Sequence, residues 1–356
     1  MHKNISIQIF SIENKNQILY RRIKKRKGKV VEEGKCLLMG ITFFVYACCV
    51  SDVTLASGGG TPYANGAEGF FCGLAPPPGL YLKNYFLFYK AEKMRDNSGD
   101  EIGAFDRAIV WADIIRFIFI TKKTFLGASY GTQLFIPYVD KDLRFNVPVG
   151  PKNKRHYTDR GIPCIIYTPY ILGYHLLNGR FHCLFATDIY IPVGSQQDNN
   201  LANVETNYWT IEPLWAFTFF LTKRWDISSK LMYSFNTEQQ DCPTIYGVNV
   251  DRRPGQEFHL DYTTSYEVAE GLRIGITGYY YKQTTDDDYD IDNSVPAPIR
   301  RLLEQDETNK GQVFAIGPGV WYHQKNWFFS LRAQWELAVK NRPDGKNLWA
   351  MFIHRF

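Results

Sequence analysis

The last residues of the chain, 345–356, read GKNLWAMFIHRF and alternate apolar and other side chains with a period of two. Successive side chains of a β-strand point to opposite sides, so this pattern predicts a strand with one apolar face. That face holds Leu348, Ala350, Phe352, His354 and Phe356. A terminal aromatic residue on such a strand is typical of the closing strand of an outer-membrane β-barrel. The alternative is the final strand of a soluble sheet.

The strongest alternation lies in residues 257–267. One face there is apolar, aromatic or Thr, beginning with Phe258, Leu260 and Tyr262. The opposite face is polar throughout: Glu257, His259, Asp261, Thr263, Ser265 and Glu267. A charge near the middle of a bilayer costs roughly 2–4 kcal/mol, so this face must look into water. In a barrel, that water fills the lumen.

Residues 124–138 and 327–339 repeat the pattern, with large apolar side chains on one face and small or polar ones on the other. Residues 105–121 are ambiguous, because Arg116 interrupts one apolar face and Asp113 stands on the other. The count of such segments predicts about 12 strands, within a range of 10–14. We therefore expect an all-β fold, a transmembrane antiparallel β-barrel over residues 80–356, located in a bacterial outer membrane.

Composition is compatible with this fold. Aromatic residues make up 16% of the chain and there are 28 glycines, which suits aromatic girdles and small lumen-facing positions. The mean hydropathy of -0.28 looks polar, yet a barrel needs apolar side chains only at alternate positions. Hydropathy therefore does not exclude a membrane.

Net charge argues against nucleic acid as a partner. Residues 1–56 hold 10 of the 41 Lys and Arg and 4 of the 36 acidic residues, which leaves 31 bases and 32 acids in residues 57–356. A chain with that balance has no basic surface for phosphates.

The amino terminus has the features of a secretory signal peptide over residues 1–56. Basic residues crowd positions 21–35, an apolar run of 15 residues follows at 36–50, and Thr54 and Ala56 precede the expected cleavage site. The apolar run is shorter than the roughly 20 residues of a membrane-spanning helix. Residues 57–79 are rich in Gly and Pro, and we expect either a partial plug of the barrel lumen or a free tail.

Four of the seven cysteines follow the signal peptide, and none lies in a CxxC or metal-like spacing. Cys164 and Cys183 either pair across neighbouring strands or stay as buried thiols. The acidic run at 286–292 lacks the Gly and bidentate Glu of a calcium-binding loop. A solvated loop that bridges divalent ions with lipopolysaccharide is the preferred reading, and we expect no metal site and no cofactor.

Several short motifs resemble one family. They are Pro62-Tyr63, Asn65 to Phe70, Pro76 to Gly79, Tyr81, Asn84, Asn207-Tyr208-Trp209, Glu212-Pro213, and Lys346 to Trp349 continuing to Phe356. Together they are similar to the SphA-like family, often labelled phenol meta-pathway degradation proteins, over residues 58–356. The resemblance implies an outer-membrane barrel that passes small hydrophobic or aromatic molecules, and it does not imply an enzyme.

The polar residues at lumen-facing positions predict the lining of a pore: Glu212, Lys230, Glu257, His259, Asp261, Arg273, Arg332 and Glu336. We expect the carboxylates among them to pair with Lys230, Arg273 and Arg332, which would set the polarity of a narrow passage. The alternative is a barrel hydrolase built from His182, His259, Ser129 and Ser265. Neighbours at i and i+2 on a strand stand about 7 Å apart, which is too far for a direct hydrogen bond.

The expected function is thus passive uptake of small hydrophobic or aromatic compounds, with a hydrolase acting on lipid or peptide, a structural barrel or a secreted soluble sheet as alternatives. The expected partners are those small molecules, outer-membrane lipid and lipopolysaccharide, and the barrel-assembly machinery. We expect that machinery to recognise Phe352 and Phe356 in the terminal strand.

Overall fold

The structure is a computed structural model that describes residues 62–146, 154–194, 196–197 and 200–356. The chain divides into two units, Met1–Asp52 and Val53–Phe356, and every described residue belongs to the second. The predicted signal peptide, residues 1–56, and the first part of the Gly/Pro-rich segment, 57–61, lie outside the described residues.

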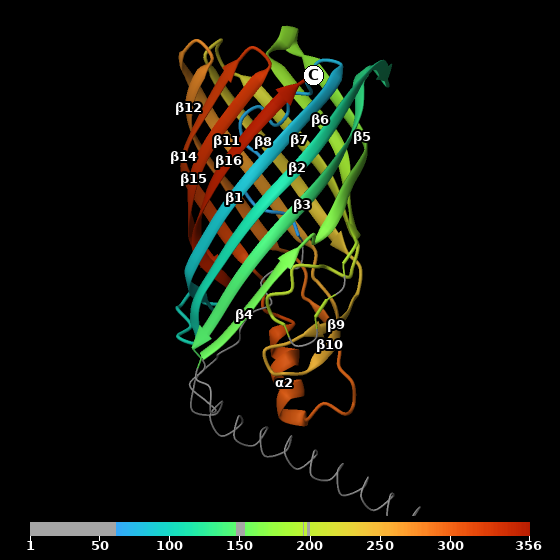
Figure 1. Cartoon of the computed structure of the whole chain (residues 1–356), viewed down its shortest axis with the longest axis vertical. Coiled ribbons are helices and arrows are strands. Elements are labelled where there is room, and N and C mark those ends of the chain that lie inside the picture. The colour runs from blue at the N-terminus through green and yellow to red at the C-terminus, as the bar shows by residue number, and fades with distance from the viewer. Residues whose placement is uncertain (1–61, 147–153, 195, 198–199) are drawn as a thin grey trace, which may run out of the picture. The chain divides into compact units, whose positions relative to one another are not determined.

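Twelve long strands form one closed antiparallel barrel (Figure 1). They are β1 (Gly79–Arg95), β2 (Phe105–Phe125), β3 (Ala128–Asn146), β5 (Cys164–Leu176), β6 (Phe181–Pro192), β7 (Thr210–Phe220), β8 (Trp225–Asn236), β11 (Glu257–Ala269), β12 (Leu272–Gln283), β14 (Gln312–Gln324), β15 (Trp327–Lys340) and β16 (Arg342–Arg355). Each pairs with the barrel strand before and after it, and β1 also pairs with β16, where Tyr85 stands opposite Met351. The predicted fold class and the predicted strand number are confirmed.

Smaller elements lie at the end of the barrel opposite the carboxyl terminus (Figure 1). Strand β4 (Lys154–Gly161) pairs with the far half of β3, and β9 (Gln239–Pro243), β10 (Asn249–Arg253) and β13 (Asp288–Asp290) form a separate sheet. The short helix α2 (Ala297–Asp306) lies at this end as well. A 3-10 turn, η1 (Leu177–Gly179), joins β5 to β6 at the other end, where the chain terminates. In the described part of the chain, no helix is both long and apolar enough to cross a membrane.

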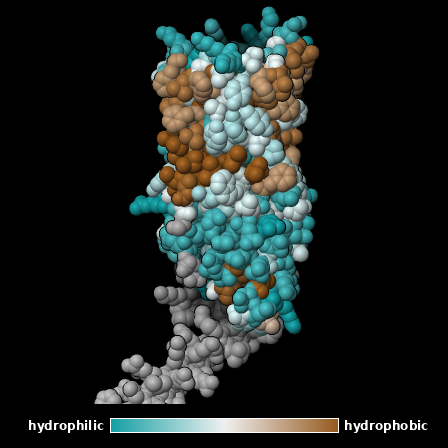
Figure 2. All heavy atoms as spheres, turned by 90° about the vertical axis from the view of Figure 1, so that its right-hand side faces the viewer, coloured by the Kyte–Doolittle hydropathy of each residue, from teal (hydrophilic) through white to brown (hydrophobic). Residues whose placement is uncertain are grey.

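The barrel is polar inside and apolar outside. On β15, Leu331 is 59% and Trp335 is 50% exposed, whereas Arg332 between them is 2% exposed. On β11, His259 and Asp261 are buried. Figure 2 shows the outward apolar side chains gathered into a band over the upper part of the face drawn. An apolar band around a closed barrel with a polar interior is the arrangement of a barrel that spans lipid.

One predicted strand boundary is wrong. The strand expected over 124–138 begins later, because β2 continues to Phe125 and the chain turns at Leu126 and Gly127. Both turn residues have positive φ, 51° and 77°. A two-residue hairpin loop with positive φ at both positions matches the right-handed twist of its strands, and glycine adopts that conformation without steric cost.

Candidate functional site

Residues 62–78, here called the lumen segment, run inside the barrel and reach β1 at Gly79. The carboxylate of Asp261 on β11 accepts hydrogen bonds from the backbone N–H groups of Gly66 and Glu68, at 2.9 and 3.0 Å, and from the hydroxyl of Tyr63 at 2.5 Å. Asp261 is fully buried. A buried carboxylate is tolerated when such donors replace water, so Asp261 is a fixed attachment point for the segment.

Arg332 on β15 makes the complementary attachment. Its guanidinium donates to three successive backbone carbonyls, those of Gly66, Ala67 and Glu68, at 2.7–2.8 Å. The sequence predicted a carboxylate partner for Arg332, and this is wrong, since its described hydrogen-bond acceptors are main-chain oxygens. Together Asp261 and Arg332 satisfy both the donors and the acceptors of the same short stretch of backbone.

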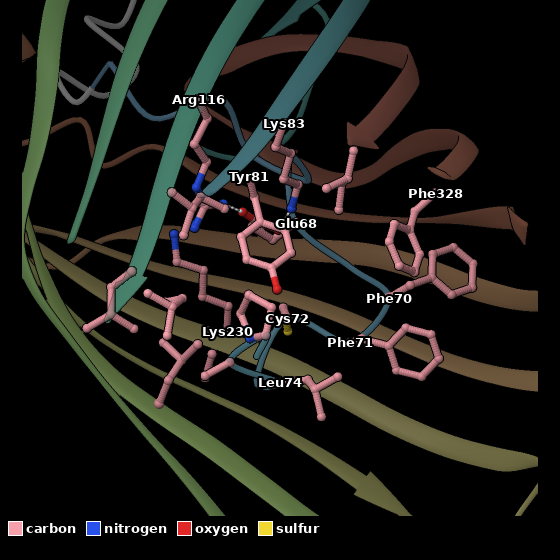
Figure 3. A pocket seen from close by; sticks show the side chains of 18 of the residues that line it. Glu68, Phe70, Phe71, Cys72, Leu74, Tyr81, Lys83, Arg116, Lys230 and Phe328 are labelled. Carbon is pink, nitrogen blue, oxygen red and sulfur yellow. Dashed lines mark hydrogen bonds and ion pairs between the residues drawn. The ribbon is translucent and has the colours of Figure 1, made fainter. Parts of the chain in front are cut away.

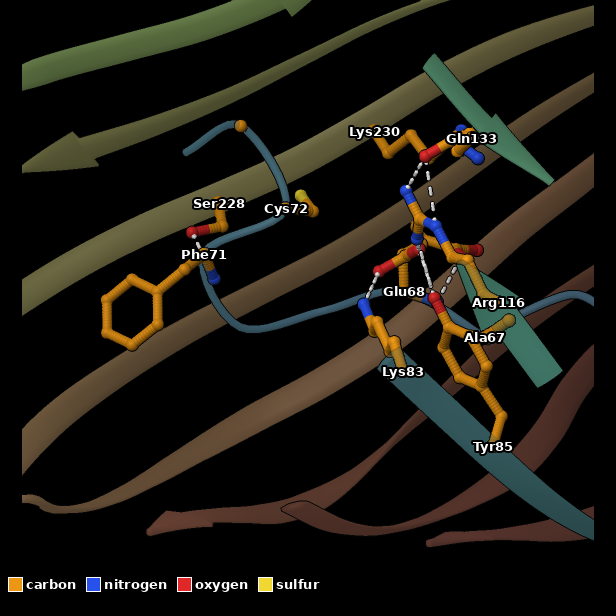
Figure 4. Close-up of polar contacts among 12 residues, drawn as sticks. Ala67, Glu68, Phe71, Cys72, Lys83, Tyr85, Arg116, Gln133, Ser228 and Lys230 are labelled. Atoms are coloured by element: carbon orange, nitrogen blue, oxygen red, sulfur yellow. Dashed lines mark hydrogen bonds and ion pairs between the residues drawn. The ribbon is translucent and has the colours of Figure 1, made fainter. Parts of the chain in front are cut away.

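The side chain of Glu68 carries the third attachment (Figure 4). Its carboxylate accepts from Lys83 on β1 at 2.8 Å, from Arg116 on β2 at 2.6 Å and from the Tyr85 hydroxyl at 2.7 Å. Arg116 also donates to Gln133 on β3 at 3.0 Å. One carboxylate of the lumen segment therefore pairs with two cations of the wall, which couples the position of the segment to three neighbouring strands.

Close backbone contact holds the rest of the segment against the wall. The N–H of Gly73 donates to Thr218 on β7 at 3.2 Å, and the N–H of Phe71 donates to Ser228 on β8 at 3.3 Å. A Cβ at position 73 would lie 2.2 Å from the backbone of Phe217, and one at Gly66 would lie 2.3 Å from Gln334. At position 73 the neighbouring atoms are backbone, so only glycine permits this approach there.

Above the segment, toward the end of the barrel where the chain terminates, lies a cavity of about 480 Å³ (Figure 3). The lumen segment supplies Phe70, Phe71 and Leu74 to its lining. The barrel wall supplies Ile118, Ile120, Ile171, Leu184, Leu214 and Trp321. Polar groups occupy its floor and rim, among them Lys83, Arg116, Lys230 and Arg355. Cavities of this size with mostly apolar walls are the usual form of small-molecule sites.

All eight residues predicted to line a pore are buried inside the barrel. Asp261, Arg332 and His259 contact the lumen segment, the last through a 2.7 Å contact between its Nδ1 and Asn65 Oδ1. Lys230 and Arg273 line the large cavity. The structure thus brings five of them to the segment or the cavity, and their role in lining a pore stays a prediction.

The other three predicted residues, Glu212, Glu257 and Glu336, bind tyrosine hydroxyls of the barrel wall. Their partners are Tyr190 at 3.0 Å, Tyr281 at 2.8 Å, and Tyr279 and Tyr89 at 2.6 and 2.9 Å respectively. The predicted carboxylate pairing holds for Arg273, whose NH2 lies 3.1 Å from Asp226 and whose NH1 lies 3.2 Å from Glu267. It also holds for Lys230, whose Nζ lies 3.7 Å from Asp188 Oδ2.

Sequence reasoning missed Glu68, Lys83 and Arg116 as site residues. Arg116 left a signal, because it interrupts an otherwise apolar face of its strand. That face points inward, with Ile114 and Ile118 buried, and a charged residue there needs an internal partner. Nothing in the sequence indicates that the partner is Glu68 in the lumen segment.

The parts of the alternative hydrolase do not come together. His259 Nε2 lies 3.5 Å from Glu257 Oε2, closer than strand spacing suggested because long side chains converge across it. His182 contacts His175, with 2.6 Å between their Nδ1 atoms. Within the described ranges, neither histidine contacts Ser129 or Ser265, and no cluster of three metal-ligating side chains forms.

The cysteines and the terminal aromatics lie apart from this site. Cys72, Cys164, Cys183 and Cys242 are free thiols. Phe352 stacks on Trp327 with ring centroids 5.6 Å apart, and Phe356 is 68% exposed at the end of the chain. Recognition of these two phenylalanines by assembly machinery stays a prediction.

Comparisons with known proteins agree with the fold. Residues 91–352 match the model of a family described as "Putative MetA-pathway of phenol degradation". No curated protein matches the sequence. The structure is similar to an outer membrane channel from Pseudomonas putida F1, with a TM-score of 0.64 and 14% identity over 80% of this chain and 98% of that one. It also aligns with the TodX ΔS2S3 mutant, a monoaromatic hydrocarbon channel, with a TM-score of 0.42 and 11% identity over 82% of this chain and 92% of that one.

Proposed function

This chain belongs to the family described as the putative MetA-pathway of phenol degradation, and we propose that it is an outer-membrane channel for the passive uptake of small hydrophobic or aromatic compounds. The observation that carries this proposal is the apolar cavity of about 480 Å³ inside the barrel. A barrel that served only as a structural element would have no need of such a space.

The lining of the cavity suits a transient occupant. Aliphatic and aromatic side chains such as Ile120, Leu214 and Phe70 offer contact to an apolar ring from several sides. Removal of apolar area from water supplies roughly 25 cal/mol per Å², so a single-ring compound gains a few kcal/mol on entry. Passage requires binding that is strong enough for entry and weak enough for release, and a binding free energy of a few kcal/mol meets both conditions.

The lumen segment lies on the path that a compound takes through the barrel. In this proposal the end with β9, β10, β13 and α2, which carries the long loops, faces outside the cell, and the cavity lies on the periplasmic side. A compound from outside then reaches the cavity past Glu68 and its cations. Passive flow through this point requires the segment to shift and return, and its hydrogen bonds to Asp261 and Arg332 limit how far it moves.

The outer surface determines the remaining partners. Outward side chains such as Leu331 and Trp335 contact the hydrocarbon of the outer membrane. The loops at the outer end meet lipopolysaccharide, and barrel-assembly machinery reads Phe352 and Phe356 during insertion. Exposed apolar residues in the terminal strand support this last role, because the strand must be recognised before the barrel closes.

The proposal is tested by measuring uptake of radiolabelled toluene in intact cells with and without the chain, at concentrations low enough that outer-membrane passage limits the rate. We expect slower uptake in cells that lack it and restoration by a plasmid copy. A hydrophilic solute of similar mass serves as the control. Equal toluene uptake in both strains would refute the proposal.

A further inference from the structure

One carboxyl group points outward from the barrel, inside the apolar run of its strand. The outward positions of β2 follow each other at a period of two, and they are Ile109, Trp111, Asp113, Ile115, Phe117 and Phe119. Asp113 is exposed among them, whereas Ala112 and Ile114, on the inward face, are buried. The carboxyl of Asp113 therefore lies among side chains that face lipid, with apolar outward residues on both sides of it along the strand.

An ionisable group among lipid tails costs free energy, and such groups in membrane proteins ordinarily face another protein or a water-filled space. The only relief described for Asp113 comes from a neighbouring strand. The side-chain amide of Asn84 on β1 donates to Asp113 Oδ1 at 2.5 Å. Among the residues that the structure describes, Asp113 Oδ2 has no hydrogen-bond partner. This oxygen is an acceptor in surroundings where hydrocarbon offers no donor.

A hydrogen-bond donor in the same condition lies next to it. Tyr138 on β3 stands directly opposite Asp113 in the sheet, and its side chain is 49% exposed. Its hydroxyl, too, has no hydrogen-bond partner within the described ranges. Opposite residues of an antiparallel pair are about 5 Å apart, so an unsatisfied acceptor and an unsatisfied donor stand side by side on the outer wall.

Aromatic rings surround these two polar groups. The ring centroid of Trp111 lies 5.4 Å from that of Phe86 and 4.3 Å from that of Phe88, both on β1. Strands β1, β2 and β3 are neighbours on the side of the barrel that faces the viewer in Figure 1. Large aromatic side chains are typical anchors of protein interfaces. The outward patch is defined as Asn84, Phe86, Phe88, Trp111, Asp113 and Tyr138.

A second copy of the chain matches the outward patch by symmetry. Every copy spans the membrane in the same orientation and at the same depth, so a two-fold axis parallel to the membrane normal places one patch against the other. With this axis between Asp113 and Tyr138, the carboxyl of each copy meets the hydroxyl of the other. Two hydrogen bonds then form per pair of chains, and all four unsatisfied groups are paired. Lipid head groups lie outside the hydrocarbon layer and do not offer this match.

We propose that the outward patch is an interface between two copies of this chain in the outer membrane, with Asp113 and Tyr138 as its central polar contacts. Side chains that hydrogen-bond across such an interface stabilise association within a membrane. The inference concerns the outer wall of the barrel, and it does not depend on which compound passes through the lumen.

Sedimentation equilibrium of the purified full chain in density-matched detergent micelles tests the interface. We expect a monomer–dimer equilibrium whose dissociation constant rises at least about tenfold in Tyr138→Phe, because this substitution removes only the hydroxyl and each dimer loses two hydrogen bonds. Asp113→Leu should weaken the dimer as well. Tyr266→Phe is the matched control, since Tyr266 is 48% exposed on β11, halfway round the barrel from β2 in the strand order. It should leave the dissociation constant unchanged.

A monomer at every protein concentration would overturn the inference. A dimer that neither Tyr138→Phe nor Asp113→Leu weakens would also overturn it, because the copies would then meet through another face. Photocrosslinking in cells, with p-benzoylphenylalanine at position 86, gives a second measurement. We expect an adduct with the mass of two chains, and an adduct with a different protein alone would assign the patch to another partner and refute the interface between copies.

Discussion

The guanidinium of Arg332 donates a 2.8 Å hydrogen bond to the backbone carbonyl of Gly66, joining residues 266 positions apart in the chain. Arg332 lies in the second-last strand, and Gly66 lies in the segment that precedes the first strand. The position of the lumen segment therefore depends on a strand near the other end of the sequence. Asp261 secures the same backbone from β11, so the segment is held by two buried charges.

Substitution of Arg332 tests this attachment. Arg332→Met leaves three carbonyls of residues 66–68 without their donor, and each buried acceptor left unsatisfied costs about 1–3 kcal/mol. We expect the amides of Gly66 and Glu68 to exchange with deuterium at least roughly a hundredfold faster while the barrel amides stay protected. Arg180→Met, at an exposed turn, is the control and should leave the exchange unchanged. Unaltered protection in Arg332→Met would refute the attachment.

The lumen segment should also need the carboxylate of Glu68 to stay attached to the barrel wall. Glu68→Gln leaves the Lys83 and Arg116 cations without their shared counter-charge, which favours partial release of the segment. We expect the temperature at which the protein loses heat-modifiable gel mobility to fall by several degrees. The double variant Glu68→Gln with Lys83→Met should recover part of the loss, since one of the two unpaired cations is gone. No recovery would indicate that Lys83 does not depend on Glu68.

Close contact at Gly73 gives a prediction about conductance. An alanine Cβ would meet the backbone of Phe217 at 2.2 Å, so Gly73→Ala forces this part of the lumen segment from the wall. Overpacking of this kind costs about 1–3 kcal/mol. We expect larger and more variable single-channel conductance in planar bilayers for Gly73→Ala than for the wild type. Gly103→Ala, whose Cβ would meet no atom within 4 Å, should conduct like the wild type.

We expect Asp306 to make the loops around α2 sensitive to pH. Burial raises the pKa of its carboxyl to about 7, although hydrogen bonds from Tyr246 and Asn309 act in the opposite direction. In the unfolded chain the pKa of an Asp carboxyl is about 3.9, so the folded loop binds the proton more tightly. The folded loop therefore loses stability as the pH rises from about 4 to about 7, by roughly 4 kcal/mol at most. Hydrogen exchange of α2, corrected for intrinsic rates, should therefore speed up between pH 5 and pH 8.

A matched pair of variants isolates that carboxyl. Asp306→Asn should remove most of the pH dependence, because the amide keeps its size and does not titrate in this range. Glu304→Gln, on an exposed position of the same helix, should retain it. Loss of the pH dependence in Glu304→Gln, or its persistence in Asp306→Asn, would assign the effect to another group.

The barrel could be predicted from the sequence because its strands face two environments, the lumen and the outside of the barrel, that differ in polarity. On β15, Leu331 and Trp335 alternate with Arg332 and Glu336, and this period of two is visible in the sequence. The wall of β2 was ambiguous for a physical reason. Its inward residues Ile114 and Ile118 are apolar because they line the internal core and the large cavity, so both faces of that strand read alike.

The attachment of the lumen segment was not predictable. Arg332 binds main-chain carbonyls, which every residue carries and which therefore leave no mark on the sequence. The partner of Arg116 is Glu68, which is 48 positions away and outside any strand. Positions of charged residues were thus evident from alternation, whereas their partners depended on how the segment folds back through the barrel.

The sequence also misplaced the turn at Leu126. The segments expected over 105–121 and 124–138 leave only residues 122 and 123 between them, yet the chain reverses at Leu126 and Gly127. Leu126 is 73% exposed at the end of the barrel, where an apolar side chain can meet the membrane surface.

The most direct test of the proposed function is the rate of toluene uptake in cells whose barrel has its large cavity filled by a bulkier side chain. Leu214→Trp places an indole in the large cavity, whereas Leu331→Trp adds the same group to the outward face, where Leu331 is 59% exposed. With equal amounts of folded barrel in the outer membrane, we predict that Leu214→Trp lowers the chain-dependent uptake at least about tenfold and that Leu331→Trp leaves it unchanged. Wild-type uptake in Leu214→Trp would contradict the claim that substrates pass through this cavity.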